Sequence, residues 1–219
     1  MDIFYRMILP NIGLLADGFL VTGKLIVSSF LAGIALAILL TALCFLSTPT
    51  RWLANILVEF FRATPMYVQL VWVAYVWPEL FGWPDTSYTA ALIAITLQTG
   101  AYLTETIRSG FLSIPRGQSE AAHALGMTPA WTMRRVVIPQ LVISIIPSLI
   151  NQLVSVVKSS TVVSVIGVAD LLYQTNSLIN RWHEPVEILT FTALIYIALV
   201  TVISVATRYV EVRIRTRFQ

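Results

Sequence analysis

The sequence predicts an all-helical membrane protein with five transmembrane helices. One observation is the composition: 57% of the 219 residues are hydrophobic, 11% are charged and the mean hydropathy is +0.80, whereas soluble domains carry about a quarter charged residues. The other is the length of the apolar runs. A bilayer core of about 30 Å needs about 20 helical residues to cross it, and several uncharged runs reach this length.

An external segment, residues 1–17, is expected before the first predicted span, residues 22–46, in which Leu25–Leu46 carries no charge. The first residues are not typical of a cleaved signal peptide, because Asp2 stands where a basic start is usual and polar residues interrupt the apolar region. We therefore expect the first span to direct its own insertion. Cys44, the only cysteine, lies in this span, which excludes an intramolecular disulfide.

The second predicted span, residues 53–80, contains charged residues. Glu59 and Arg62 are three positions apart, so they can pair on one face of a helix. Because an ionised group is costly inside a bilayer, we expect this face to turn toward protein or water. Pro65 is expected to kink the span.

The third predicted span, residues 88–108, ends in a similar pair, Glu105 and Arg108. We place this pair near the cytoplasmic end of the span, where long side chains reach water easily. A structural role is favoured for it over contact with a substrate.

The fourth and fifth predicted spans are residues 136–158 and 188–208, whose central runs are uncharged. Between them, the apolar run Val162–Ile166 is too short to cross a bilayer. The segment 161–187 is therefore expected to be interfacial or re-entrant.

The distribution of basic residues predicts the orientation, because cytoplasmic loops are enriched in Lys and Arg. With the C-terminus inside, the outer face keeps three basic residues, Arg6, Lys24 and Arg181. The N-terminus is then external, and residues 114–135 and the tail 212–219 are cytoplasmic. The inner loops and the tail hold eight arginines: Arg51, Arg116, Arg134, Arg135, Arg208, Arg213, Arg215 and Arg217.

Catalytic chemistry is poorly supported by the sequence, and we assign no catalytic residue and no metal site. His123 and His183 fall on opposite sides of the predicted membrane, so they cannot share a metal ion. Residues 18–24, GFLVTGK, match the glycine and lysine spacing of a phosphate-binding loop, but Leu25 stands where Ser or Thr would bind magnesium. If ATP is used, another subunit must bind it with its magnesium; no cofactor is expected on this chain.

The polar insert 114–135 lies between two predicted spans and is long enough for a helical hairpin. Ala121 and Ala122 follow Glu120 and give a small, flat helix face. Gly126 can end that helix in a left-handed conformation, and Pro129 can begin a second one. A small-residue helix with one carboxylate suits a groove on a partner; an amphipathic loop without a partner is the alternative.

These residues resemble the EAA loop of the permease subunits of type I ABC importers. The match consists of Glu120, Ala121, Ala122, three residues, Gly126, nine residues, and then VVIP at 136–139. The wider run AYLTETIRSGFLSIPRGQSEAAHALGM, with FRATP at 61–65, is similar to the polar amino acid uptake (HisM/GlnP-like) branch. The resemblance implies the type I importer permease fold over residues 18–211, with the loop as the coupling helix of the ATPase.

Polar residues inside the predicted spans are candidates for the translocation path. Arg62 is equally compatible with a gating structure and with a substrate contact. The resemblance places Lys158 beside the path, where its ammonium and the hydroxyls that follow suit a carboxylate; a lysine reaching the outer interface is the alternative. The uncharged candidates line the path or bridge helices. The full candidate set is Arg62, Thr64, Gln69, Gln98, Glu105, Lys158, Ser159 and Ser160.

The sequence therefore predicts a permease subunit of an ATP-driven importer for an amino acid or similar zwitterion, working by alternating access in a bacterial cytoplasmic (inner) membrane. The expected partners are two ATP-binding subunits, a second identical or homologous permease chain, an external or periplasmic binding protein and the lipid bilayer, but no nucleic acid. A non-transporting scaffold or receptor is the alternative. The binding protein is expected to meet acidic residues on the outer face: Glu79, Asp85, Asp170, Glu184 and Glu187.

Overall fold

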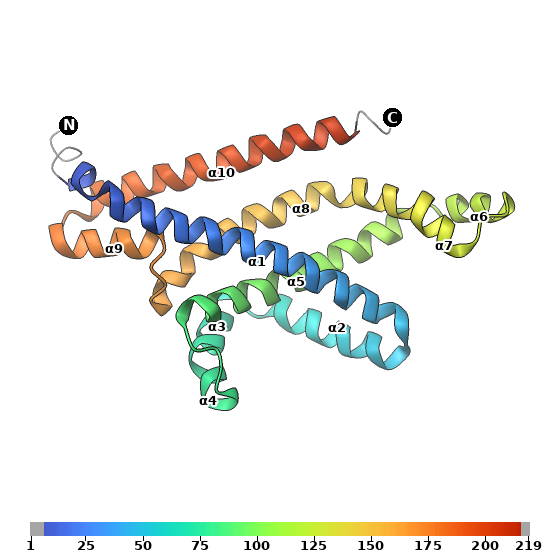
Figure 1. The fold of residues 1–219 in the computed structure, drawn as a ribbon, viewed down its shortest axis with the longest axis horizontal. Coiled ribbons are helices and arrows are strands. Elements are labelled where there is room, and N and C mark those ends of the chain that lie inside the picture. The colour runs from blue at the N-terminus through green and yellow to red at the C-terminus, as the bar shows by residue number, and fades with distance from the viewer. Residues whose placement is uncertain (1–6, 216–219) are drawn as a thin grey trace.

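The computed structural model describes residues 7–215, with side chains to residue 209. The first predicted external residues, 1–6, and the end of the predicted tail, 216–219, lie outside them. Every regular element in the described part is helical (Figure 1). The α-helices are α1 Ile12–Leu46, α2 Thr48–Ala63, α3 Met66–Val71, α4 Trp77–Phe81, α5 Ser87–Ser113, α6 Arg116–Ala124, α7 Pro129–Thr132, α8 Ile138–Ser160, α9 Leu171–Trp182 and α10 Pro185–Arg215.

Three continuous helical stretches among the described residues are long and apolar enough to cross a bilayer. They are Leu9–Leu46, Pro129–Ile166 and Pro185–Tyr209, and they contain the first, fourth and fifth predicted spans. The helices extend beyond the predicted bounds; α1 begins at Ile12 rather than near residue 22.

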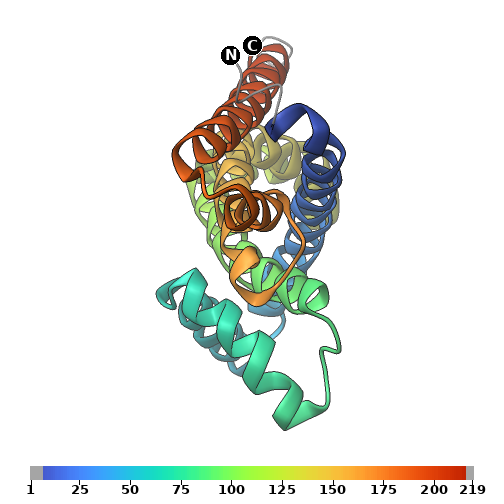
Figure 2. The same cartoon turned by 90° about the vertical axis from the view of Figure 1, so that its left-hand side faces the viewer.

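The second predicted span is broken rather than kinked. The helical stretches Thr48–Ala63 and Met66–Phe81 meet at an angle of 109°, and Thr64 between them has an extended backbone. Proline disfavours helical geometry in the residue before it, so Pro65 ends α2 and a new helix starts beyond it. Figure 2 shows the segment from α2 to α4 lying to one side of the other helices. The count of five spans stays a prediction.

Helix α5 lies at the centre of the fold, packed along α1 and against α2 and α8. Small residues allow the close approach: a Cβ on Gly33 of α1 would lie 2.6 Å from the Thr99 side chain of α5, and a Cβ on Gly100 of α5 would lie 2.6 Å from Leu36 of α1. Small residues are the usual means of close helix packing in membranes. The third predicted span is thus surrounded by protein, which explains how it carries polar groups.

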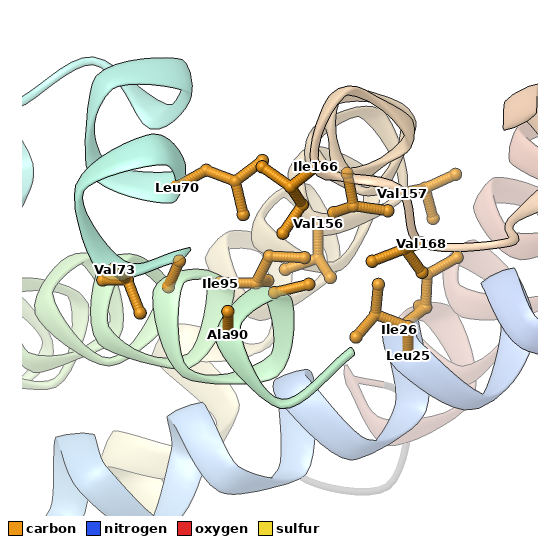
Figure 3. Close-up of a cluster of buried hydrophobic side chains, with 13 residues drawn as sticks. Leu25, Ile26, Leu70, Val73, Ala90, Ile95, Val156, Val157, Ile166 and Val168 are labelled. Atoms are coloured by element: carbon orange, nitrogen blue, oxygen red, sulfur yellow. The ribbon is translucent and has the colours of Figure 1, made fainter. Parts of the chain in front are cut away.

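A core cluster joins α1, α3, α5 and the end of α8 (Figure 3). Leu70 of α3 and Ile95 of α5 point toward Val156 of α8 and toward Ile166, in the 3-10 helix Thr161–Ile166 that extends α8. The short apolar run after the fourth predicted span is therefore a continuation of that span. It ends at Gly167, which has a φ of +82°.

Helix α9, which follows this turn, packs against the start of α1. Gly18 of α1 makes the approach possible, because a Cβ there would lie 2.9 Å from both the Asp170 carbonyl oxygen and the Leu171 Cα. These are backbone atoms that cannot rotate away. Gly13 lies earlier in α1, and a Cβ added to it would have no neighbouring atom within 4 Å.

We therefore expect Gly18→Ala to lower the thermal unfolding midpoint in detergent, since overpacking costs about 1–3 kcal/mol. The matched Gly13→Ala change should leave the midpoint unchanged or raise it slightly, because alanine favours a helix over glycine by about 0.5–1 kcal/mol. Equal midpoints for the two variants would show that α9 does not rest on Gly18.

Candidate functional site

The predicted polar insert forms a helical hairpin between α5 and α8, at one end of the molecule (Figure 1). Helix α6 ends as the sequence predicts. Gly126 has a φ of +77°, the Leu125 N–H donates to the Ala121 carbonyl oxygen at 3.1 Å, and the Met127 N–H donates to the Ala122 carbonyl oxygen at 3.1 Å. This left-handed turn satisfies carbonyl groups that a helix end otherwise leaves unpaired.

The hairpin exposes most of α6. Ala122 alone in α6 is buried, with 4% exposure, whereas Glu120 and Ala121 face outward. Leu125, just beyond the helix, is 83% exposed. Small, apolar and acidic groups are thus presented together on one short helix, a surface suited to a protein partner.

The second half of the hairpin is continuous with the membrane helix. Thr128 caps α7, its hydroxyl accepting from the Trp131 N–H at 3.4 Å. The π-helical turn Met133–Val137 then joins α7 to α8 without a break. Through α7, the exposed α6 is therefore connected to a helix that is long and apolar enough to cross a bilayer.

Arg62 lies in the last turn of α2, at the break in the second predicted span. Its Nη1 is 3.6 Å from the Glu59 Oε2, and its guanidinium lies 5.6 Å from the centroid of the Tyr102 ring on α5. The Tyr102 hydroxyl also donates to the Arg62 carbonyl oxygen at 3.4 Å. The Nε of Arg62 is buried without a hydrogen-bond partner, so this residue ties α2 to α5 and keeps one unused donor.

Two other predicted residues at this break make structural bonds. The Thr64 hydroxyl donates to the Phe60 carbonyl oxygen at 2.7 Å, which closes the end of α2. Gln69 of α3 is fully buried, and its Nε2 donates to the Ala94 carbonyl oxygen of α5 at 3.4 Å. Gln69 therefore bridges two helices, while its Oε1 is buried without a partner.

The Glu105–Arg108 pair forms on α5, with Nη1 and Oε2 3.4 Å apart. Arg108 Nη1 also donates to the Asn55 Oδ1 of α2 at 3.0 Å. Sequence reasoning missed Asn55, whose amide in an apolar helix was the available signal. Gln98, also on α5, is half-buried.

Lys158 lies in the last turn of α8 and is exposed. Ser160 is fully buried, and its hydroxyl donates to the Val157 carbonyl oxygen at 2.8 Å; the Thr161 hydroxyl donates to the Lys158 carbonyl oxygen at 2.7 Å. Of the hydroxyls that follow Lys158, those of Ser160 and Thr161 are thus bonded to the helix backbone rather than available to a carboxylate. Ser159 is half-buried.

Four of the candidates lie on two sides of a shared apolar core. Arg62, Thr64 and Gln69 surround the α2–α3 break against α5, and Lys158 lies on α8, whose neighbouring Val156 and Val157 share a core cluster with Leu70 of α3. In the part of the chain that the structure describes, no three His, Cys, Asp or Glu side chains gather into a possible metal site.

Comparison with known proteins identifies the family. The family of the binding-protein-dependent transport system inner membrane component matches residues 29–216. The chain belongs to this family. The family and its relatives are named for transport and give no support to the alternative of a non-transporting scaffold.

The relatives of this chain are named as permease proteins. The chain is 34% identical to the arginine transport system permease protein ArtQ of Bacillus subtilis, over 99% of both chains. It is 30% identical to the probable glutamine ABC transporter permease protein GlnM of the same species, over all of this chain and 94% of that one.

Solved structures agree with these relatives. A chain from the crystal structure of an amino acid ABC transporter with histidines superposes with a TM-score of 0.87 at 32% identity, covering 93% of this chain and 95% of that one. A chain of the MetNI methionine ABC transporter in an inward-facing conformation has a TM-score of 0.77 at 20% identity, covering 94% and 98%, and supports the fold alone. This chain has the type I ABC importer permease fold.

One acidic residue of this chain, Asp170, is not on the surface, where the sequence suggested it would be. Asp170, expected to meet an external binding protein, is fully buried and cannot do so. Its Oδ1 caps α9 by accepting from the Tyr173 N–H at 2.9 Å, and its Oδ2 is buried without a partner. The Thr22 hydroxyl of α1 accepts from the adjacent Leu171 N–H at 3.1 Å.

Burial raises the pKa of Asp170 from 3.8 to about 6, against the lowering effect of backbone hydrogen bonds; Tyr196 of α10 is the titratable group facing it. The folded protein therefore holds this proton more tightly than the unfolded chain. The stability contributed by the protonated form is complete below about pH 4 and is lost as the pH rises through 6. From the two pKa values, the loss is on the order of 3 kcal/mol.

Asp170→Asn keeps the capping oxygen and removes the titration. The thermal midpoint of this variant, compared with that of the unaltered protein, is expected to gain steadily between pH 4 and pH 6 and to level off above. A difference in midpoint that stays constant from pH 4 to pH 8 would contradict the buried, protonated carboxyl.

Proposed function

We propose that this chain is the permease subunit of an ATP-driven importer for an amino acid. The exposed α6 surface carries the proposal: Glu120 and Ala121 face outward on a helix whose end is fixed by Gly126, in a family whose members serve binding-protein-dependent transport. The relatives named for arginine and glutamine transport support the substrate class. ATP is hydrolysed by a separate subunit that docks on this hairpin.

The proposed arrangement in the membrane has five spans, an external N-terminus and a cytoplasmic C-terminus. In this arrangement α5 forms the third span, and the segment from α2 to α4 forms the broken second span. The most hydrophobic windows of the α8 and α10 stretches are only 17% and 11% buried within this chain. That leaves apolar surface for lipid and for a second permease chain, with which this subunit would form the alternating-access path.

We place the path along the polar side chains at the α2–α3 break and at the end of α8. Lys158, with Ser159, would hold the carboxylate of the substrate, because its ammonium is exposed at the end of α8 and carries three hydrogen-bond donors. Arg62 would stand at the α2–α3 break, its buried Nε being an unused donor. Glu105 is assigned to the structural tie with Arg108 and α2.

Reconstitution tests the proposal. The permease is co-expressed with the ATP-binding and binding-protein genes that neighbour its own, and the purified assembly is placed in proteoliposomes with each of the twenty amino acids. We expect one or a few amino acids to stimulate both ATP hydrolysis and uptake. An assembly that contains the ATPase but takes up no amino acid would refute the substrate class and leave the docking role intact.

A further inference from the structure

Two clefts meet at the end of α1 and α5 that lies toward the hairpin. One is a groove of about 430 Å³ between α1, α5 and α8. The other is a cleft of about 320 Å³ where α1, α5 and the start of α2 come together. Phe45 and Phe111 line both, with their rings 5.8 Å apart in an edge-to-face arrangement. The two clefts are therefore neighbours that share the Phe45–Phe111 pair, and together they form the depression considered below.

The groove is suited to a hydrocarbon chain. Apart from the Thr41 hydroxyl, its lining side chains are apolar. On α1 it runs from Ile34 to Phe45 and on α8 from Ile138 to Leu149, which at 1.5 Å per helical residue is about 16 Å. One leaflet of a bilayer core of about 30 Å has a depth of about 15 Å. The groove thus matches an acyl chain lying along a single leaflet.

The adjoining cleft is suited to an anion. Its charged lining residues are two arginines, Arg51 and Arg108. The Arg51 Nε donates to the Cys44 carbonyl oxygen at 3.0 Å. The Arg108 Nη1 donates to the Asn55 Oδ1 at 3.0 Å and pairs with the Glu105 Oε2 at 3.4 Å, so a phosphate there would share Arg108 with a carboxylate. These bonds fix the two side chains at the cleft and leave further N–H groups of each guanidinium, a group with five donors. Planar guanidinium groups bind phosphate well.

We propose that this depression is a binding site for an anionic phospholipid of the cytoplasmic leaflet. The phosphate lies on Arg51 and Arg108, and one acyl chain lies in the groove past Phe45 and Phe111. The leaflet follows from the orientation under the proposed function; the site itself does not depend on transport. A lipid fits better than a segment of a second permease chain, because an anionic head and a leaflet-length apolar tail match the two parts in order.

Native mass spectrometry of the assembled importer, released from nanodiscs, tests the site. The discs contain phosphatidylcholine with a minor fraction of phosphatidylglycerol, and the retained phosphatidylglycerol is counted. Since each arginine near a membrane surface contributes roughly a fivefold effect, Arg51→Gln with Arg108→Gln should weaken retention about 30-fold. Arg181→Gln with Arg208→Gln removes the same charge outside the two clefts and outside the hairpin, and should retain the lipid.

A second variant tests the groove without changing charge. Ala42 is exposed and lines the groove, so Ala42→Phe should reduce the retained diacyl lipid while the binding of inorganic phosphate, measured by titration, stays the same. Unchanged retention in both the arginine and the Ala42 variants would overturn the proposal. So would a photoreactive side chain at position 42 that crosslinks to a permease chain instead of to lipid.

Discussion

Replacing Ala121 with arginine is expected to abolish the stimulation of ATP hydrolysis by substrate and to stop uptake. Ala121 is exposed on α6, and the proposed docking leaves no room there for a long charged side chain. An unpaired charge buried in an interface costs about 2–5 kcal/mol, which weakens docking by at least about 30-fold. The ATPase rate of the purified assembly, with and without substrate, measures the effect.

Deleting residues 120–122 should have the same consequence without preventing membrane insertion. The point substitution is the sharper test, because the deletion also removes Ala122, which is buried within the hairpin, and shortens the helix before Gly126. The control is Ala16→Arg, the same change at an exposed position outside the hairpin, near the N-terminal end of α1. Normal coupling in the Ala121→Arg variant would exclude α6 as the docking surface.

Lys158→Ala is expected to lower the uptake rate by about 10- to 100-fold while the assembly forms normally. A hydrogen bond to a charged group contributes about 1.5–3 kcal/mol, and the substrate carboxylate would lose this partner inside the membrane. Uptake of labelled amino acid by proteoliposomes gives the rate, and gel filtration of the purified complex gives the assembly.

Lys24→Ala is the natural control, since Lys24 is the only other lysine of the chain and is also exposed. It lies in α1 and is not among the path candidates, so its replacement should leave uptake within twofold or so. If Lys158→Ala transports at the unaltered rate, Lys158 reaches the interface and plays no part in the path.

The features that the sequence predicts well are those set by neighbouring residues. Uncharged runs of about 20 residues mark the helices α1, α8 and α10, and the order of glycine and proline marks the hairpin: Gly126 ends α6, and Pro129 begins α7. Each depends on local geometry or on transfer into lipid, which a single chain segment determines by itself.

The features that the sequence does not predict depend on distant partners. Pro65 indicates a bend, but the angle of 109° accompanies packing of α3 on α5, which includes the bond from Gln69 to Ala94. Asp170 looks like a surface residue in a polar loop, yet it is buried beside a backbone N–H that bonds to Thr22, far earlier in the chain. Ser160 looks available to a ligand, although its own helix accepts its hydrogen bond.

The helical stretch from Pro129 to Ile166 is continuous, so α7, α8 and the end that bears Lys158 form one rod, which the turn at residues 125–128 joins to α6. A tilt imposed by an ATPase on one end would displace the opposite end in proportion to its distance, with no loop to absorb the movement. Pro147 lies within α8 and has no N–H to give to the preceding turn. Any flexing of this rod would therefore concentrate at that residue, near the middle of α8.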